Sequence, residues 1–209
     1  MREQITAGKF HAAGGVGDWR SLYHLVAAHF RTGSLAESST LVAEISRLAG
    51  GDAEQYLNLD LRPAGVTVTL GRRDVALARR ISAAAAELGL AADPAAVQVV
   101  NVTLDALVGA EVLPFWRAVL GYRQLGDDYL FDPARRGPGF GLQQLDAARP
   151  QRNRMHLDVA VPHDQAAARV AAALAAGGRL VSDEHAPKWW TLADAEGNEV
   201  CVATWMGRE

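Results

Sequence analysis

An internal repeat in the second half of the chain constrains the fold more than any other feature of the sequence. The pattern runs strand, helix and three short strands from Val99, and it recurs from His156, about 55 residues later. The predicted strands of the two units cover residues 99–104, 122–125, 129–131 and 140–145, then 156–161, 179–182, 190–192 and 200–204. Two such βαβββ units placed side by side can curl their sheets around one cupped site.

Each unit of the repeat also carries one predicted helix. The first helix ends at Gly121, and the second begins after a capping Asp164 and ends at Gly177. Apolar residues recur at helical spacing along the first helix, at Val112, Phe115, Trp116, Val119 and Leu120. Together with the strands, these helices predict an α+β fold class.

The first half of the chain predicts two helices around two strands. One helix follows Ser34, which has the capping-box spacing to a glutamate three residues later, and the other follows Asp74. Strands with alternating apolar residues are predicted at 57–61 and 66–70. Residues 19–30 are rich in apolar side chains and fit either a strand or a helix.

A domain boundary is predicted near residues 91–96. This segment follows a helix that stops at a glycine, and Pro94 prevents the helix from continuing. A β-rich run begins directly after it. We therefore expect one domain at residues 1–92 and a second at residues 97–209.

Composition and charge narrow the classes of partner. The net charge of the 209 residues is −3, and the arginine pairs are scattered among acidic residues, so we expect no nucleic-acid or membrane partner. Cys201 is the single cysteine, which fits a reducing compartment. A polar N-terminus and the lack of a long apolar run add to the expectation of a cytoplasmic protein.

Residues 97–205 resemble the vicinal oxygen chelate superfamily, which includes glyoxalases, bleomycin-resistance proteins and extradiol dioxygenases. Three segments carry the resemblance, at 114–122 (PFWRAVLGY), 153–158 (NRMHLD) and 194–202 (DAEGNEVCV). The resemblance implies that the repeat is a paired βαβββ domain with its site inside the cup.

The superfamily's metal centres take a histidine from the first strand and a glutamate from the last strand of each unit. His156 stands at one of these four places, but Asn101, Gln143 or Gln144, and Cys201 stand at the others. Amides and a thiol are a poor set for a hard divalent ion. We therefore expect no cofactor and no catalytic metal; a divalent metal, if one binds, would use His156 and Cys201.

Residues 18–90 resemble pterin-4a-carbinolamine dehydratases, an α/β sandwich, through short segments at residues 30–34, 42–43, 59–62, 66–70 and 74–79. The family's two adjacent histidines and proline are replaced here by Gln55, Tyr56 and Leu57, and the segment with its third histidine is missing after Leu70. The resemblance thus implies a degenerate domain that serves as a scaffold, a dimerisation surface or a lid. The tandem of these two domains recurs in actinobacteria.

Candidate site residues gather on the predicted cup. His156 and Asp158 share one strand face, where they can act as general acid or base, and Asn101 can donate a hydrogen bond to a developing oxyanion. Cys201 is either a nucleophile or a small buried filler. Further candidate ligand contacts are Gln143, Gln144, His185, Trp189 and Trp190, with at least one of the tryptophans expected to fill the core.

These residues lead to three hypotheses about function. The first is a metal-independent enzyme of specialised metabolism, a lyase, dehydratase, isomerase or cyclase that acts on an aromatic or polyketide-like small molecule. The second is a non-catalytic drug-binding protein of the bleomycin-resistance type. The third is residual 4a-hydroxytetrahydrobiopterin dehydratase activity. Both family resemblances imply a homodimer.

Overall fold

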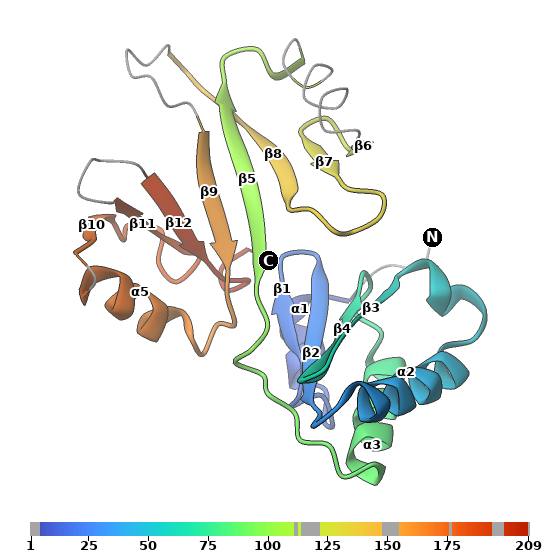
Figure 1. Ribbon diagram of the computed structural model, residues 1–209. Coiled ribbons are helices and arrows are strands. Elements are labelled where there is room, and N and C mark those ends of the chain that lie inside the picture. The colour runs from blue at the N-terminus through green and yellow to red at the C-terminus, as the bar shows by residue number, and fades with distance from the viewer. Residues whose placement is uncertain are drawn as a thin grey trace. The chain divides into compact units, whose positions relative to one another are not determined.

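The computed structural model describes residues 5–110, 113, 122–147, 155–175, 177–193 and 199–208. Its contacts divide the chain into two compact units (Figure 1). Unit 1 comprises Met1–Gln98 with two short later segments, Pro162–Gln165 and Trp205–Glu209. Unit 2 comprises Val99–Val161 and Ala166–Thr204. Both units combine helices with a β-sheet, in agreement with the predicted α+β class.

Unit 1 contains a four-stranded antiparallel sheet with the order β1-β2-β4-β3. Its strands are β1 (Arg20–Leu22), β2 (Leu25–Arg31), β3 (Leu57–Arg62) and β4 (Gly65–Leu70). The last two strands were predicted within one residue at each end. The stretch 19–30, for which the sequence left strand and helix open, forms the first two strands.

The helices of unit 1 are α1 (Ala7–Ala12), α2 (Leu35–Ala49), α3 (Val75–Glu87) and a short 3-10 helix, Gly51–Gln55. The side chains of Ser34 and Asp74 cap α2 and α3 as predicted. The capping box is only half confirmed, because the Glu37 carboxylate accepts a hydrogen bond from the amide of Gly33, at 2.7 Å, one residue before the cap.

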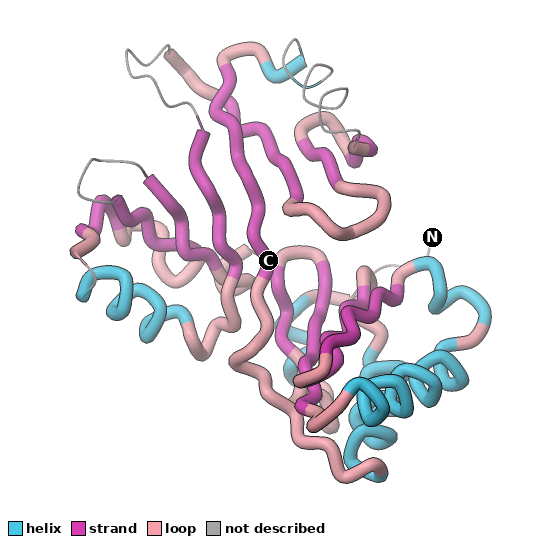
Figure 2. Tube along the Cα trace, viewed as in Figure 1, coloured by secondary structure: helices cyan, strands magenta, loops and turns pink. Residues whose placement is uncertain are grey.

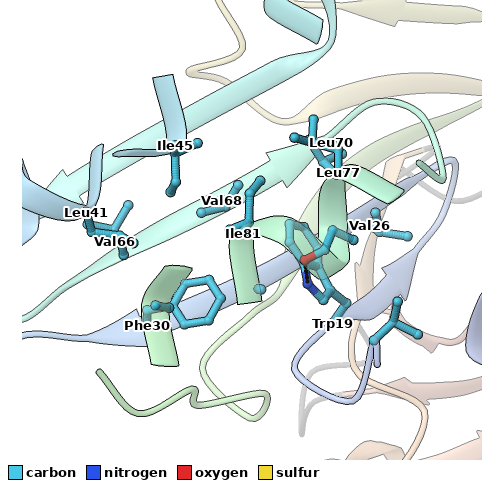
Figure 3. Packing of buried hydrophobic residues seen from close by; sticks show 14 of the residues in the cluster. Trp19, Val26, Phe30, Leu41, Ile45, Val66, Val68, Leu70, Leu77 and Ile81 are labelled. Carbon is cyan, nitrogen blue, oxygen red and sulfur yellow. Dashed lines mark hydrogen bonds between the residues drawn. The ribbon is translucent and has the colours of Figure 1, made fainter. Parts of the chain in front are cut away.

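The core of unit 1 lies between one face of the sheet and the two longer helices (Figure 3). Apolar side chains of β2 and β4 meet those of α2 and α3 there, among them Val66, Val68, Leu41 and Ile81. Trp19 is fully buried in this cluster, and its indole N–H donates to the carbonyl of Ala78 at 3.2 Å. This bond satisfies the polar end of the side chain.

The segment predicted as the domain boundary, residues 91–96, is tied to unit 1. Arg31 at the end of β2 forms an ion pair with Asp93, with the closest N–O distance at 2.6 Å. The backbone amide of Asp93 also donates to the carbonyl of His29 at 2.7 Å. Contacts of this kind extend the first unit as far as Gln98.

Unit 2 contains one eight-stranded sheet with the order β10-β11-β12-β9-β5-β8-β7-β6. Figure 2 draws the strands in magenta. The order is symmetric about the antiparallel pair of β5 and β9, each of which is the first strand of one repeat. The strands are β5 (Val99–Ala106), β6 (Arg123–Leu125), β7 (Tyr129–Phe131), β8 (Gly139–Gln144), β9 (Met155–Ala160), β10 (Arg179–Ser182), β11 (Trp189–Ala193) and β12 (Glu199–Ala203). The predicted repeat is therefore confirmed at the level of strands.

The helix of the second repeat is α5 (Ala166–Ala175), and Gly177 follows it with a φ of 96°, as a helix stop requires. The predicted cap is wrong: α5 begins two residues after Asp164, whose carboxylate instead accepts hydrogen bonds from the guanidinium of Arg20 at 2.8 and 3.3 Å. The helix predicted over residues 112–120 lies outside the described residues, apart from the buried Leu113.

Two late segments of the chain complete unit 1. The indole N–H of Trp205 donates to Nδ1 of His163 at 3.1 Å, and the Trp205 ring stacks on His11 with the centroids 5.5 Å apart. The two histidine rings lie edge to face at 5.2 Å. We call His11, His163 and Trp205 the aromatic cluster of unit 1. Along the described ranges, no helix is both long and apolar enough to cross a membrane.

Candidate functional site

Strand β5, at the centre of the eight-stranded sheet, has one polar and one apolar face. Asn101, Thr103 and Asp105 alternate with apolar residues, and all three polar residues are buried, with exposed fractions of 6%, 8% and 6%. The opposite face carries Leu104, which packs with Phe140 and others in an apolar cluster. The strand alternation thus places a line of polar groups at the middle of the sheet.

Asp158 of β9 lies directly beside these residues. We call Asn101, Thr103 and Asp158 the polar line. It pairs with Asn101 in the antiparallel ladder, and Thr103 pairs with His156. The hydroxyl of Thr103 donates to Oδ2 of Asp158 at 2.9 Å, which ties the two central strands together through their side chains. The described part of the chain includes the backbone of His156 but not its side chain. The strand register therefore gives only the position of His156 in β9, opposite Thr103.

Cys201 of β12 continues the polar line on the far side of Asp158. It pairs with Asp158 in a parallel ladder and with Thr191 of β11 in an antiparallel one. The pKa of its thiol is raised to about 12, chiefly by burial and next by the neighbouring Asp158 carboxylate, which accepts a hydrogen bond from the thiol. The thiol is therefore protonated at neutral pH, which suits a filler and a donor rather than a nucleophile.

Tyr129 of β7 reaches the polar line from the other side. Its hydroxyl donates to Oδ1 of Asn101 at 3.2 Å. The side chain passes over β8, where Gly139 pairs with Asn101 and Gly141 pairs with Tyr129 itself. A Cβ atom at Gly139 would collide with the Tyr129 hydroxyl and with Oδ1 of Asn101. Burial, the largest cause, raises the pKa of Tyr129, so its phenol is neutral and can donate.

The two predicted glutamines lie on opposite faces of β8. Gln143 pairs with Asp105 and is exposed on the polar face. Gln144 lies on the other face, where its amide donates to the carbonyls of Leu107 and Leu145 at 2.7 and 2.9 Å. Gln143 can therefore take part in the candidate site, whereas Gln144 fastens a loop.

The predicted aromatic contacts also divide between the faces. Trp190 packs on an apolar cluster with Val202 and Leu192, opposite the face of Cys201, so it is the tryptophan that fills the core. Trp189 lies on the same face as Cys201, and its ring is 4.3 Å from that of His185, centroid to centroid. Lys188 places its ammonium 5.2 Å from the same tryptophan ring.

The described donors do not fit a divalent metal at this face. Asn101 already receives the Tyr129 hydroxyl on its amide oxygen, and Cys201 holds its proton. Gln144 points away. Within the described ranges, no three His, Cys, Asp or Glu side chains are grouped as metal ligands would be. The described groups can take part in hydrogen bonding and proton transfer.

Three residues of the site were missed by reasoning from sequence: Thr103, Asp105 and Tyr129. Thr103 and Asp105 could have been found from the sequence, because they lie two and four residues after Asn101 and so share its face of the strand. Tyr129 carried a weaker one, because the glycines of β8 leave room that a large neighbour must fill. At Gly141 the Tyr129 ring lies 3.7 Å from the position that a Cβ atom would take.

Comparisons with known proteins find one family match and several similar solved structures. Residues 101–203 match the model of a family described as a glyoxalase-like domain. One similar solved structure is NAD-dependent benzaldehyde dehydrogenase from Legionella pneumophila, with a TM-score of 0.39 and 12% identity over 50% of this chain and 97% of that one. Another is a glyoxalase/bleomycin resistance protein/dioxygenase superfamily member from Vibrio splendidus 12B01, with a TM-score of 0.34 and 17% identity over 52% and 99%.

The curated proteins include no match to this chain. The family match extends from the polar line of β5 to the end of β12 and so spans both repeats. It confirms the predicted resemblance for the second half of the sequence. Residues 101–203 are similar to a glyoxalase-like domain.

Proposed function

We propose that the glyoxalase-like domain is a metal-independent enzyme that acts on a small organic molecule by general acid–base chemistry. Asp158 and His156 are the proton-transferring groups of this proposal, and Asn101 is the hydrogen-bond donor to an oxygen of the substrate. Dehydration, isomerisation and cyclisation all need a base at one atom and a donor at a neighbouring oxygen. The domain is therefore assigned to lyase, isomerase or cyclase chemistry.

One observation carries the proposal: the polar line of Asn101, Thr103 and Asp158 at the centre of the sheet. Burying polar groups costs free energy, and a sheet that served only as a scaffold would place apolar residues at these positions. The other face of the same strands does so, with Leu104 and Phe140 in an apolar cluster. The hydrogen bonds from Thr103 and Tyr129 hold Asp158 and Asn101 in place.

The aromatic and cationic groups beside the polar line suggest the kind of substrate. Trp189 shares the face of Cys201, with Lys188 and His185 next to its ring. An aromatic or polyketide-like molecule with an oxygen function fits both the polar line and this edge. This assignment of substrate class is part of the proposal.

A ligand screen by thermal shift, with product analysis by chromatography, tests the function. The metal content of the purified protein is measured on the same sample. We expect turnover without a stoichiometric metal, at least about 100-fold slower in His156→Gln, as for loss of a general acid or base. His29→Gln, the same change in unit 1, leaves turnover unchanged.

One result would argue against the enzyme, and another would argue only against the role of His156. A ligand that is bound tightly and recovered unchanged would make the domain a drug-binding protein of the bleomycin-resistance type. Full turnover in His156→Gln would remove His156 from the mechanism while leaving the domain an enzyme.

For unit 1 we propose a scaffold role on a degenerate dehydratase-like fold. Its four-stranded antiparallel sheet with helices on one face supports this reading. Tyr56 stands where the family has a histidine, and its hydroxyl donates to Asp74 at 2.9 Å while Arg72 covers its ring at 4.8 Å. The hydroxyl and the ring of Tyr56 are therefore both in contact with other side chains of unit 1. A direct assay with the pterin carbinolamine tests this, and turnover would contradict it.

A further inference from the structure

We propose that Tyr129 is a positioning residue that turns the Asn101 amide so that its nitrogen serves as the donor to a carbonyl oxygen of the ligand. This inference rests on the proposed function, because it concerns the same polar line. It adds a residue on a neighbouring strand and names the ligand group that the site receives.

The path of Tyr129 to Asn101 depends on two glycines of β8. Gly139 lies between the two side chains, and a Cβ atom there would collide with both. At Gly141 the nearest side-chain atoms to a Cβ would be the Tyr129 ring at 3.7 Å and Oγ1 of Thr103 at 3.8 Å. The bare backbone of β8 is therefore the surface over which the tyrosine extends to the central strand.

The hydrogen bond fixes the orientation of the amide. A neutral phenol donates its proton, and the amide oxygen is the acceptor, at 3.2 Å. An amide carries its oxygen and its NH₂ group on opposite sides, so the Asn101 nitrogen must point away from Tyr129. Tyr129 is two strands from Asn101, and it acts on the ligand only through that amide.

The Asn101 nitrogen is then the free donor of the polar line. Within the described part of the chain, the Asn101 side chain makes no other hydrogen bond, although only 6% of the residue is exposed. Asp158, its ladder partner on β9, offers acceptor oxygens at the next position. A donor beside an acceptor matches a carbonyl oxygen with an acidic hydrogen or hydroxyl on the adjacent atom.

Side-chain amide NMR of the full-length protein tests the inference. The Nδ2 resonances of Asn101 are assigned by their absence in Asn101→Asp. Acetophenone is the probe with a carbonyl oxygen, and ethylbenzene is its counterpart without one. Both are titrated into wild type, Tyr129→Phe and Gly139→Ala. Tyr122→Phe is the matched control, since Tyr122 packs on the apolar cluster of the opposite face.

In wild type we expect acetophenone, and not ethylbenzene, to shift the Asn101 amide resonances. Tyr129→Phe is expected to move these resonances in the free protein and to weaken acetophenone binding about fivefold to tenfold, the loss of one oriented hydrogen bond. Gly139→Ala, which keeps the phenol but displaces it, is expected to do the same. Binding of ethylbenzene, a readout of shape alone, stays constant in all variants.

Either of two results would overturn the inference. Asn101 resonances that are unchanged in Tyr129→Phe would show that the tyrosine does not orient the amide. Acetophenone that leaves the wild-type amide unperturbed would remove the carbonyl assignment. Loss of turnover in His156→Gln with intact Tyr129 coupling would uphold both proposals, whereas intact coupling without any turnover would contradict the proposed function alone.

Discussion

Oγ1 of Thr103 donates a hydrogen bond of 2.9 Å to Oδ2 of Asp158 across the two central strands of unit 2. The bond joins the first strand of one repeat to the first strand of the other, at the symmetry centre of the sheet. The bond holds the carboxylate to which we assign proton transfer. Its contribution to the free energy of unfolding can be measured without a substrate.

Removing this donor should destabilise the protein modestly. Thr103→Val keeps the shape but leaves the Asp158 carboxylate short of one partner, so we expect the free energy of unfolding to fall by about 1–2 kcal/mol. Chemical denaturation followed by circular dichroism measures the change. Thr103→Ser keeps the hydroxyl and should lose less, and equal losses in both variants would contradict a role for the hydrogen bond.

The two glycines of β8 should respond differently to a methyl group. Gly139→Ala forces Tyr129 or Asn101 to move, and we expect a loss of about 1–3 kcal/mol, as for other overpacked sites. Gly141→Ala meets its nearest side-chain atoms at 3.7 and 3.8 Å and should lie within about 0.5 kcal/mol of wild type. Thermal melts of both variants give the comparison, and a tolerated Gly139→Ala would show that Tyr129 does not occupy that space.

The regular elements could be predicted because their signals are local. Alternation with period two located the strands of both repeats, and the capping residues Ser34 and Asp74 located two helices. Asp164 has the same chemistry as those caps but forms an ion pair with Arg20, far away in sequence. A local pattern cannot foresee that competing partner.

The candidate site was predictable only along single strands. Asn101 came from family spacing, and Asp158 came from the strand alternation that places it on the same face as His156. Tyr129 depends on the pairing of β7 with β8 and of β8 with β5, and no local pattern in the sequence specifies that order. Trp205 was missed in the same way, because its partners His11 and His163 lie far from it in the chain.

The thiol of Cys201 should be unreactive in the folded protein. Its pKa is raised to about 12, chiefly by burial and next by Asp158, so the neutral thiol is favoured well above pH 8. We expect slow alkylation by iodoacetamide at pH 8 and rapid alkylation after unfolding in urea. Mass spectrometry over time measures both rates. Rapid modification of the native protein would show that the thiol is an activated group.

The aromatic cluster of unit 1 should make stability fall in mild acid. Burial is the main cause that lowers the pKa of His11 from 6.5 to about 4; His163, Arg20 and Arg73 lower it as well, and Asp164 opposes them. Nε2 of His11 also accepts a hydrogen bond from the amide of Ser21 at 3.2 Å, which a proton would break.

The direction in which stability changes with pH follows from proton binding. Between pH 6.5 and about 4 the unfolded chain binds the proton that the folded protein excludes, so stability is full above pH 6.5 and is lost as the pH falls toward 4. We expect the melting temperature of wild type to drop across this range and that of His11→Gln to drop less. His185→Gln, outside the cluster, should follow wild type; identical pH profiles for all three proteins would contradict the assignment.

Hydrogen exchange of a bound ligand tests the central claim most directly. Aromatic carbonyl compounds are incubated in D₂O with chelator-treated protein, and proton NMR follows the acidic C–H next to the carbonyl. We expect the chelator-treated wild type to catalyse the exchange. We expect the Asp158→Asn variant to be at least about 100-fold slower, as for loss of a general base. Exchange that disappears on chelation and returns with a divalent ion, or that is unchanged in Asp158→Asn, would contradict metal-independent catalysis on the polar line.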